Sequence, residues 1–186
     1  PYTVDETTPI DMWEGYTKEP MVYFPETFDP QNHGGLTKAV AIAQFGAWQI
    51  QLTEPDPIPR TGKGKPLGGR KQLEAGKSPN DYLKQLKEDP QYEKEVGHTP
   101  ESTLWEYLSR LEEKNEFTDD WQGKGSGRYI LGGYFPGSNV KSAYVAYAFW
   151  NRDYRQAYLG RDVAEDVSPD FGASSAVRVL QSGKLK

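Results

Sequence analysis

The chain has 186 residues and carries 27 acidic against 22 basic side chains, a net charge of −5 that excludes a globally basic nucleic-acid binder. Its length fits one domain, alone or with long extensions. With no cysteine and two histidines, the chain excludes disulfides, thiol nucleophiles, Cys-ligated zinc and multi-histidine metal sites, so no cofactor is indicated.

Charge is unevenly distributed along the chain. Residues 1–59 carry a net charge of −7, 60–77 carry +5, 78–120 carry −7 and 121–186 carry +4. Alternating blocks of this kind fold back on one another or meet oppositely charged partners. The chain also contains 24 aromatic residues, which offset a low aliphatic content. This composition favours a modest, aromatic-rich core.

Residues 1–35 read as an extended arm. Five prolines interrupt this segment, and each removes a backbone hydrogen-bond donor. Large apolar side chains recur between the prolines, which is unusual for a solvated tail. We expect the arm to lie on a surface, its own or a partner's, through Trp13, Tyr16, Tyr23, Phe24 and Phe28. The chain starts at Pro1 without a methionine, which favours a processed or truncated N-terminus and leaves the localisation unknown.

Residues 36–186 are expected to form a single α+β domain. The segment 36–45 fits either a short helix or a strand. After it, Ile50 and Leu52 alternate with Gln49 and Gln51, which predicts a strand with one buried face. The longest uncharged run has 15 residues, fewer than the roughly 20 that a bilayer span requires, so we expect a soluble protein without a transmembrane segment.

A basic, Pro/Gly-rich loop is expected at 54–77. Loops of this length are usually functional or disordered. Its cations alternate with glycines, and exposed backbone N–H groups beside cations can hold a phosphate or another anion. The spacing is not that of a P-loop, so contact with a protein partner remains an alternative. The residues concerned are Arg60, Lys63, Lys65, Arg70 and Lys71.

Two helices follow the loop. Ser78-Pro79 and Thr99-Pro100 each supply an N-cap residue and a proline at the first helical position. The first helix ends before Pro90, and the second spans roughly 100–115. In the second, an apolar stripe is expected to face the core, because its leucines recur at i, i+4 and i+7: Leu104, Leu108 and Leu111.

The C-terminal third is predicted to be β-rich, aromatic and basic. The segment 123–139 reads as turn, strand and turn, 142–151 reads as a second strand, and 153–159 and 174–180 are further strand candidates. Tyrosines and arginines on such a sheet can stack on bases or sugar rings, although half of the tyrosines are expected to fill the core. Nucleic acid is not favoured as a partner. The candidate ligand-binding residues are Tyr129, Tyr134, Tyr144, Tyr147, Arg152 and Arg155.

Catalytic and metal-binding signals are weak. Asp119 and Asp120 are adjacent acids of the kind that glycosidases use in pairs, but acids in a polar turn more often cap or solvate. The acids between 162 and 170 lack the order of a helical calcium loop. No catalytic residue and no metal ligand is therefore assigned, and the sequence favours a protein that is not an enzyme.

The stretch at 128–180 resembles the C-terminal part of C-type-lectin-like and formylglycine-enzyme-like domains. The resemblance rests on RYILGGYF, SAYVAYAFWN and GASSAVRVL, which match a Gly-Gly-aromatic strand, a variable aromatic stretch and a final Val-Arg strand. It does not extend to the N-terminal two-thirds of the chain. It implies a binding scaffold and carries no individual functional residue.

Together these patterns predict an α+β fold. A small antiparallel sheet in the C-terminal third would pack with two or three short helices, joined by the arm and the Pro/Gly-rich loop. The first functional hypothesis is a non-catalytic, structural or accessory subunit that contacts protein partners in a larger complex. The alternatives are a glycan- or anion-binding module and a carboxylate-based hydrolase.

Overall fold

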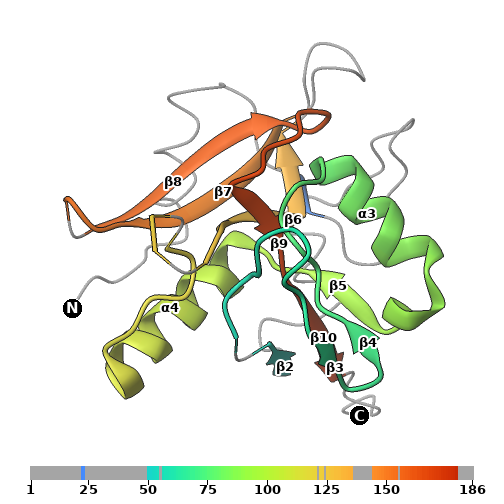
Figure 1. Ribbon diagram of the computed structural model, residues 1–186, viewed down its shortest axis with the longest axis horizontal. Helices are drawn as coiled ribbons and strands as arrows, with labels where there is room; N and C mark the ends of the chain where they lie inside the picture. The colour runs from blue at the N-terminus through green and yellow to red at the C-terminus, as the bar shows by residue number, and fades with distance from the viewer. Residues whose placement is uncertain are drawn as a thin grey trace, which may run out of the picture.

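A computed structural model of the chain describes most of the region from Ile50 to Val179 (Figure 1). Within the described residues the fold is α+β, as predicted, with two α-helices and three small, mostly antiparallel sheets. Of the arm residues, Trp13, Tyr16, Phe24 and Phe28 lie outside the described part, as does the segment 36–45. The described ranges are 22–23, 50–54, 56–120, 122–123, 125–135, 144–154 and 156–179.

The largest sheet is built mainly from the C-terminal third of the chain. Its antiparallel strands follow the order β1-β6-β7-β8, and the short strand β9 pairs in parallel with β6. Strands β7 and β8 form a long hairpin, the orange ribbon in Figure 1. The strands are β1 (Val22–Tyr23), β6 (Gly127–Phe135), β7 (Tyr144–Asn151), β8 (Gln156–Val163) and β9 (Phe171–Ala173).

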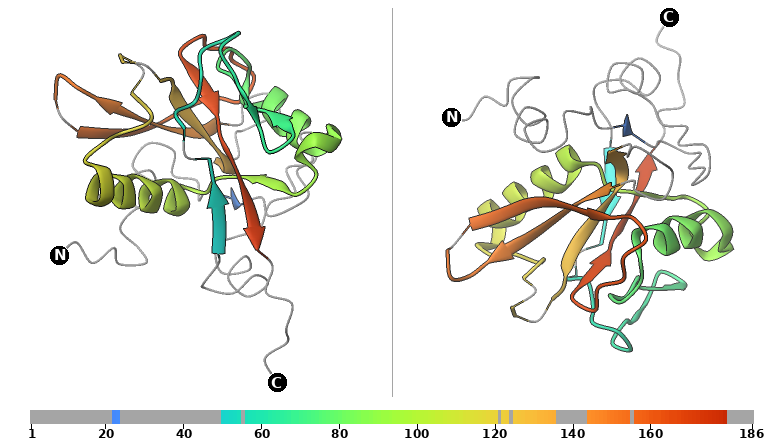
Figure 2. Two further views of the ribbon diagram at one scale, coloured as in Figure 1. Left: turned by 60° about the horizontal axis from the view of Figure 1, so that its bottom comes forward. Right: turned by 90° about the horizontal axis from the view of Figure 1, so that it is seen from above.

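A second sheet joins distant parts of the chain. Its central strand is β10 (Ser175–Val179), which lies between β2 (Ile50–Thr53) and β5 (Glu95–Gly97) (Figure 2). Strand β5 leads into a close backbone contact with β6: a Cβ added to Gly132 would lie 2.5 Å from the carbonyl oxygen of His98. Only glycine permits this approach.

Both helices begin where the sequence predicts. Helix α3 (Pro79–Glu88) has Ser78 as its N-cap, and helix α4 (Pro100–Lys114) has Thr99. Each start is a capping box, in which the cap side chain accepts the N3 backbone N–H and the N3 side chain accepts the cap N–H. The short 3₁₀ helix η1 (Pro90–Tyr92) follows α3.

The two helices pack on opposite faces of the large sheet. On one face, Tyr82 and Leu86 of α3 join Tyr129 and Val145 in the main core cluster. On the other face, Tyr107 of α4 packs with Ile130, Ala146 and Ala148. Because alternate residues of β6 and β7 contribute to the two clusters, the sheet is covered by a helix on each side.

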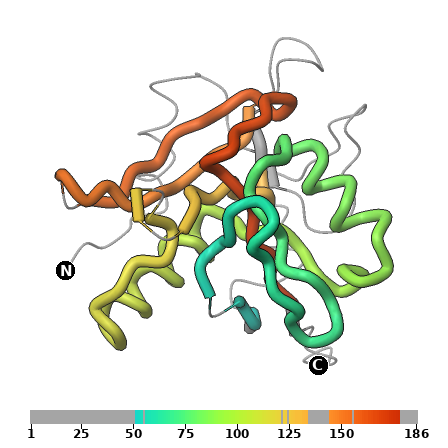
Figure 3. Tube along the Cα trace, viewed as in Figure 1, coloured from blue at the N-terminus to red at the C-terminus, as the bar shows by residue number. Residues whose placement is uncertain are grey.

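The structure corrects two expectations about the N-terminal half. The segment 54–77 is not only loop: it contains a hairpin of β3 (Pro66–Leu67) and β4 (Arg70–Lys71), turned by Gly68 and Gly69 at positive φ (Figure 3). Leu52, expected on the buried face of its strand, is 62% exposed. No helix among the described residues is long and apolar enough to cross a membrane.

Candidate interaction surface

Helix α4 is amphipathic in the reverse sense to the sequence prediction. Its buried residues include Thr103, Glu106 and Tyr107. The apolar side expected in the core instead faces outward: Trp105 is 69% exposed, and Leu108 and Leu111 are 52% and 38% exposed. The prediction that the leucine stripe packs in the core was therefore wrong.

The reversal is caused by Arg128, a buried cation on β6. Its side chain is 2% exposed and its guanidinium contacts two carboxylates. Nη1 donates to Oε2 of Glu106 at 2.6 Å, and Nε lies 2.6 Å from Oδ2 of Asp119. Tyr107 also donates its hydroxyl to Oδ2 of Asp119 at 2.6 Å. A buried charge requires such partners, so α4 turns Glu106 inward.

The pKa directions within this buried cluster follow from burial and from Arg128. Burial opposes ionisation of Glu106, but the Arg128 guanidinium overrides that effect and lowers the pKa of Glu106 to about 2. Burial raises the pKa of Asp119, which Arg128 and the Tyr107 hydroxyl only partly offset. Burial, with Arg128 adding to it, lowers the pKa of His98 to about 4, so this imidazole is neutral at pH 7.

The outward side of α4 forms a defined apolar surface. We use the name α4 face for Leu104, Trp105, Leu108 and Leu111, which share one side of the helix because residues three, four and seven apart lie above one another. Glu101 and Glu112 lie on the same side of the helix, one at each end of these four residues. The α4 face is thus apolar in the middle and acidic at both ends.

The sequence contains a signal for this arrangement. Thr103, Glu106 and Arg110 recur at i, i+3 and i+7, which is also a stripe along one side of a helix. Two stripes of equal regularity compete for the interior. Arg128, which lies 22 residues after Glu106, decides between them, and no local pattern predicts that contact.

In the basic loop, two backbone N–H groups and one of the predicted cations, Lys71, contact a carboxylate of the chain itself. The backbone N–H groups of Gly62 and Gly64 donate to the two oxygens of Glu74 at 2.9 and 2.7 Å. Lys71 Nζ lies 2.8 Å from the same carboxylate. Hydrogen bonds from Lys71 and Gly62 lower the pKa of Glu74 to about 2. The N–H groups of Gly62 and Gly64 are therefore bound to a carboxylate of this chain.

The other loop cations divide into paired and exposed groups. Arg60 forms an ion pair with Asp170. Arg70 is nearly buried between Glu54, at 2.5 Å, and Glu95. Lys63 and Lys65 are exposed. The five predicted cations therefore do not converge on one site, because three of them bind carboxylates of this chain.

The predicted tyrosine and arginine residues lie in different environments. Tyr129 is fully buried in the core, and its hydroxyl lies 3.3 Å from Oδ2 of Asp162. Tyr144 packs on the α4 side of the sheet, where the Arg161 guanidinium lies 4.4 Å from its ring centre. Tyr147 packs on the opposite side. The structure does not bring these residues to one surface.

Four further predicted residues complete this account. Arg152 has a side chain 59% exposed and forms an ion pair with Asp120. Tyr134 of β6 pairs through its backbone with β1 and β7, and Tyr23 of β1 pairs with Gly133 of β6. The side chains of Tyr134 and Tyr23 are outside the described part. Arg155 is outside it altogether.

A partly exposed group of rings lies on the α3 side of the β7–β8 hairpin. We call it the aromatic ledge: Tyr147, Phe149, Tyr158 and Phe171. The rings of Phe149 and Tyr158 stack with centroids 5.3 Å apart and planes 5° from parallel. Phe171 meets Phe149 edge-on at 5.9 Å. All four side chains are half-buried.

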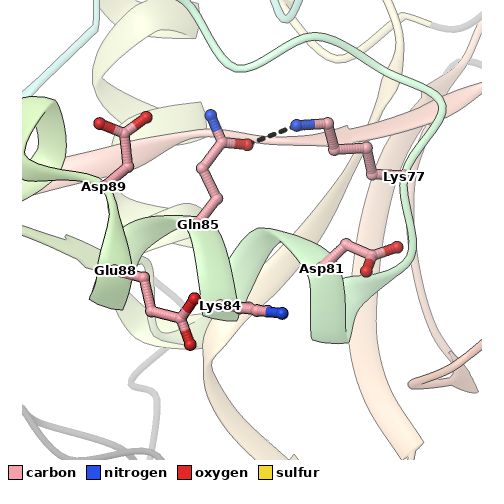
Figure 4. Close-up of a pocket in the computed structure, with 6 residues that line it drawn as sticks. All are labelled: Lys77, Asp81, Lys84, Gln85, Glu88 and Asp89. Carbon is pink, nitrogen blue, oxygen red and sulfur yellow. Dashed lines mark hydrogen bonds between the residues drawn. The ribbon is translucent and has the colours of Figure 1, made fainter.

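The acids considered for catalysis are held by structural contacts. Asp119 is fully buried, and Asp120 is 7% exposed beside Arg152. Among the described residues, no group of three or more His, Cys, Asp or Glu side chains could hold a metal ion. An open hollow of about 460 Å³ runs along α3 (Figure 4). The residues that line it are five charged side chains of both signs and one amide: Lys77, Asp81, Lys84, Gln85, Glu88 and Asp89.

Comparisons of the chain with protein-family models, curated proteins and solved structures find no match. Among the features described above, the α4 face has the largest exposed apolar side chains on one regular element. It is therefore the candidate functional surface.

Proposed function

We propose that the protein is a non-catalytic interaction subunit of a larger assembly and that it binds a protein partner through the α4 face. The observation that carries this proposal is the reversed amphipathicity of α4. A helix that buries Thr103 and Glu106 while exposing Trp and Leu side chains gains stability when a partner covers those apolar groups.

The composition of the α4 face supports a protein contact. Single exposed apolar residues are common on any surface, but a contiguous apolar patch with a polar rim is typical of interaction sites. Trp105 suits the centre of such a site, because tryptophan is enriched among residues that dominate binding energy. The arm and the exposed Lys63 and Lys65 belong to the same proposal as secondary contacts.

A site-specific crosslink tests the proposal. A photoreactive amino acid at position 108 of the full chain should give a discrete protein adduct in extracts of its native cells. The same group at Lys84, an exposed position on α3, is the matched control and should give none. Replacing Trp105 by Ala should abolish the adduct at 108. Equal labelling from both positions would contradict the proposal.

The second candidate function is a glycan-binding module, favoured by the aromatic ledge. The flat stacked pair of Phe149 and Tyr158 offers apolar ring surface of the kind on which the faces of sugars pack. A thermal-shift screen with a panel of oligosaccharides tests it, because a saturating ligand stabilises the folded state by mass action. If a sugar raises Tm and Tyr158→Ala removes that rise, the result supports this candidate. If no sugar raises Tm, the sugars of the panel are excluded as ligands.

A further inference from the structure

We propose that the partner of the α4 face is an amphipathic helix that presents basic residues at both ends of its apolar stripe. This inference rests on the proposed function. It adds the chemistry of the partner, which follows from the charges that surround the α4 face.

Glu101 and Glu112 set the spacing of the basic residues on the partner helix. They lie on the same side of α4, eleven positions apart, with the apolar residues between them. At 1.5 Å per residue this separation is about 16 Å, or three helical turns. A helix packed along α4 would therefore place Lys or Arg about three turns apart on its own apolar side, opposite these two carboxylates. Leucines between them would pack against Trp105 and Leu108.

A second copy of this chain fits the α4 face less well. In an antiparallel pair centred between Trp105 and Leu108, Glu101 of each copy would oppose Glu112 of the other. In a parallel pair, each glutamate would oppose itself. Both arrangements place like charges at the two ends of the contact, where they destabilise it.

The N-terminal arm is also a poor match in charge. Residues 1–35 contain seven acidic side chains and one basic one, Lys18. Although the arm contains apolar groups that could cover leucines, its net charge of −6 would meet the acidic ends of the α4 face. A basic helix satisfies both the apolar centre and the acidic ends.

Two designed peptides test the inference with the full-length protein. Each is a 15-residue helix with a leucine stripe flanked by two charged residues eleven positions apart, lysine in one peptide and glutamate in the other. Binding is measured by fluorescence anisotropy of the labelled peptide. We expect the lysine peptide to bind about tenfold more tightly than the glutamate peptide. A tenfold difference in Kd corresponds to about 1.4 kcal/mol, which two partly solvated ion pairs can supply. Raising the salt concentration should reduce this difference.

Variants separate the charge inference from the proposed function. In the double variant Glu101→Gln with Glu112→Gln, the affinities of the two peptides should differ by no more than about threefold. The control Glu88→Gln on α3 should keep the tenfold difference in affinity. Leu108→Glu should abolish binding of both peptides without lowering Tm. Equal binding of both peptides to the parent protein overturns the charge inference alone. Binding that survives Leu108→Glu overturns the proposed function as well.

Two further outcomes would identify a different occupant. If the protein is a dimer that Leu108→Glu dissociates, the α4 face binds a second copy and the proposal is overturned. If Trp13→Ser strengthens binding of the lysine peptide about tenfold or more, the arm occupies the α4 face and the proposal is again overturned.

Discussion

Replacing Arg128 by Met is predicted to destabilise the protein severely. The substitution keeps most of the side-chain volume and removes the charge that neutralises Glu106 and Asp119. Both carboxylates are buried, and neither gains another cation in place of Arg128 except for the contact of Glu106 with Arg110. Removing one partner from a buried ion pair typically costs about 3–5 kcal/mol. Domains of this size have a total stability of about 5–15 kcal/mol, so the loss is a large fraction of it.

Urea denaturation measures this cost as a fall in the midpoint at constant m-value. Arg152→Met is the matched control, because Arg152 also pairs with an aspartate but has a side chain 59% exposed. Asp120 of this pair is buried, so the control should cost about 1–3 kcal/mol, less than Arg128→Met. The Arg128→Met penalty should also be smaller at pH 5 than at pH 8, because protonation relieves the unpaired carboxylates. Equal midpoints for the two variants would refute this account of the buried cluster.

Three more predictions concern stability. The pKa of His98 is lowered to about 4 in the folded protein, so the stability that its neutral form contributes is present above the unfolded pKa of about 6.5 and is lost as the pH falls toward 4. The urea midpoint of the parent protein should therefore fall between pH 6.5 and 4.5, and that of His98→Gln should fall less. An equal fall in both proteins would contradict this. Glu74→Gln should lower Tm by several degrees at pH 7, because the Gly62 and Gly64 N–H groups lose a charged acceptor, whereas Glu88→Gln should not. Gly132→Ala should cost about 1–3 kcal/mol by calorimetry, because its Cβ would overlap the His98 carbonyl; a neutral result would show that β5 and β6 can separate.

The helices could be predicted because their signals are local. Ser78-Pro79 and Thr99-Pro100 act within one turn, and each cap forms within three residues of its proline. The long strands β6 and β7 were also predicted, because runs of aromatic and β-branched residues favour strands wherever they pair. These parts of the fold depend little on distant contacts.

The parts that the sequence did not predict depend on distant partners. Strands β5 and β9 have three residues each and exist because β10 and β6 pair with them. The face that α4 turns inward depends on Arg128, and the state of the basic loop depends on Glu74. In α4 the buried charge of Arg128 outweighs the local hydrophobic pattern. The α4 face was visible in the sequence as a leucine stripe, but it was assigned to the core.

The position of β10 in the second sheet has a consequence for biogenesis. Val179 pairs with Ile50, a separation of 129 residues, and β10 is also the only strand joined to β5 in that sheet within the described part. During synthesis, β2 and β5 emerge long before the strand that lies between them. Until β10 follows, both present unpaired backbone edges that can pair with other chains. The nascent chain is thus exposed to aggregation from the synthesis of β2 until β10 follows, and a premature stop before Ser175 would leave those edges open permanently.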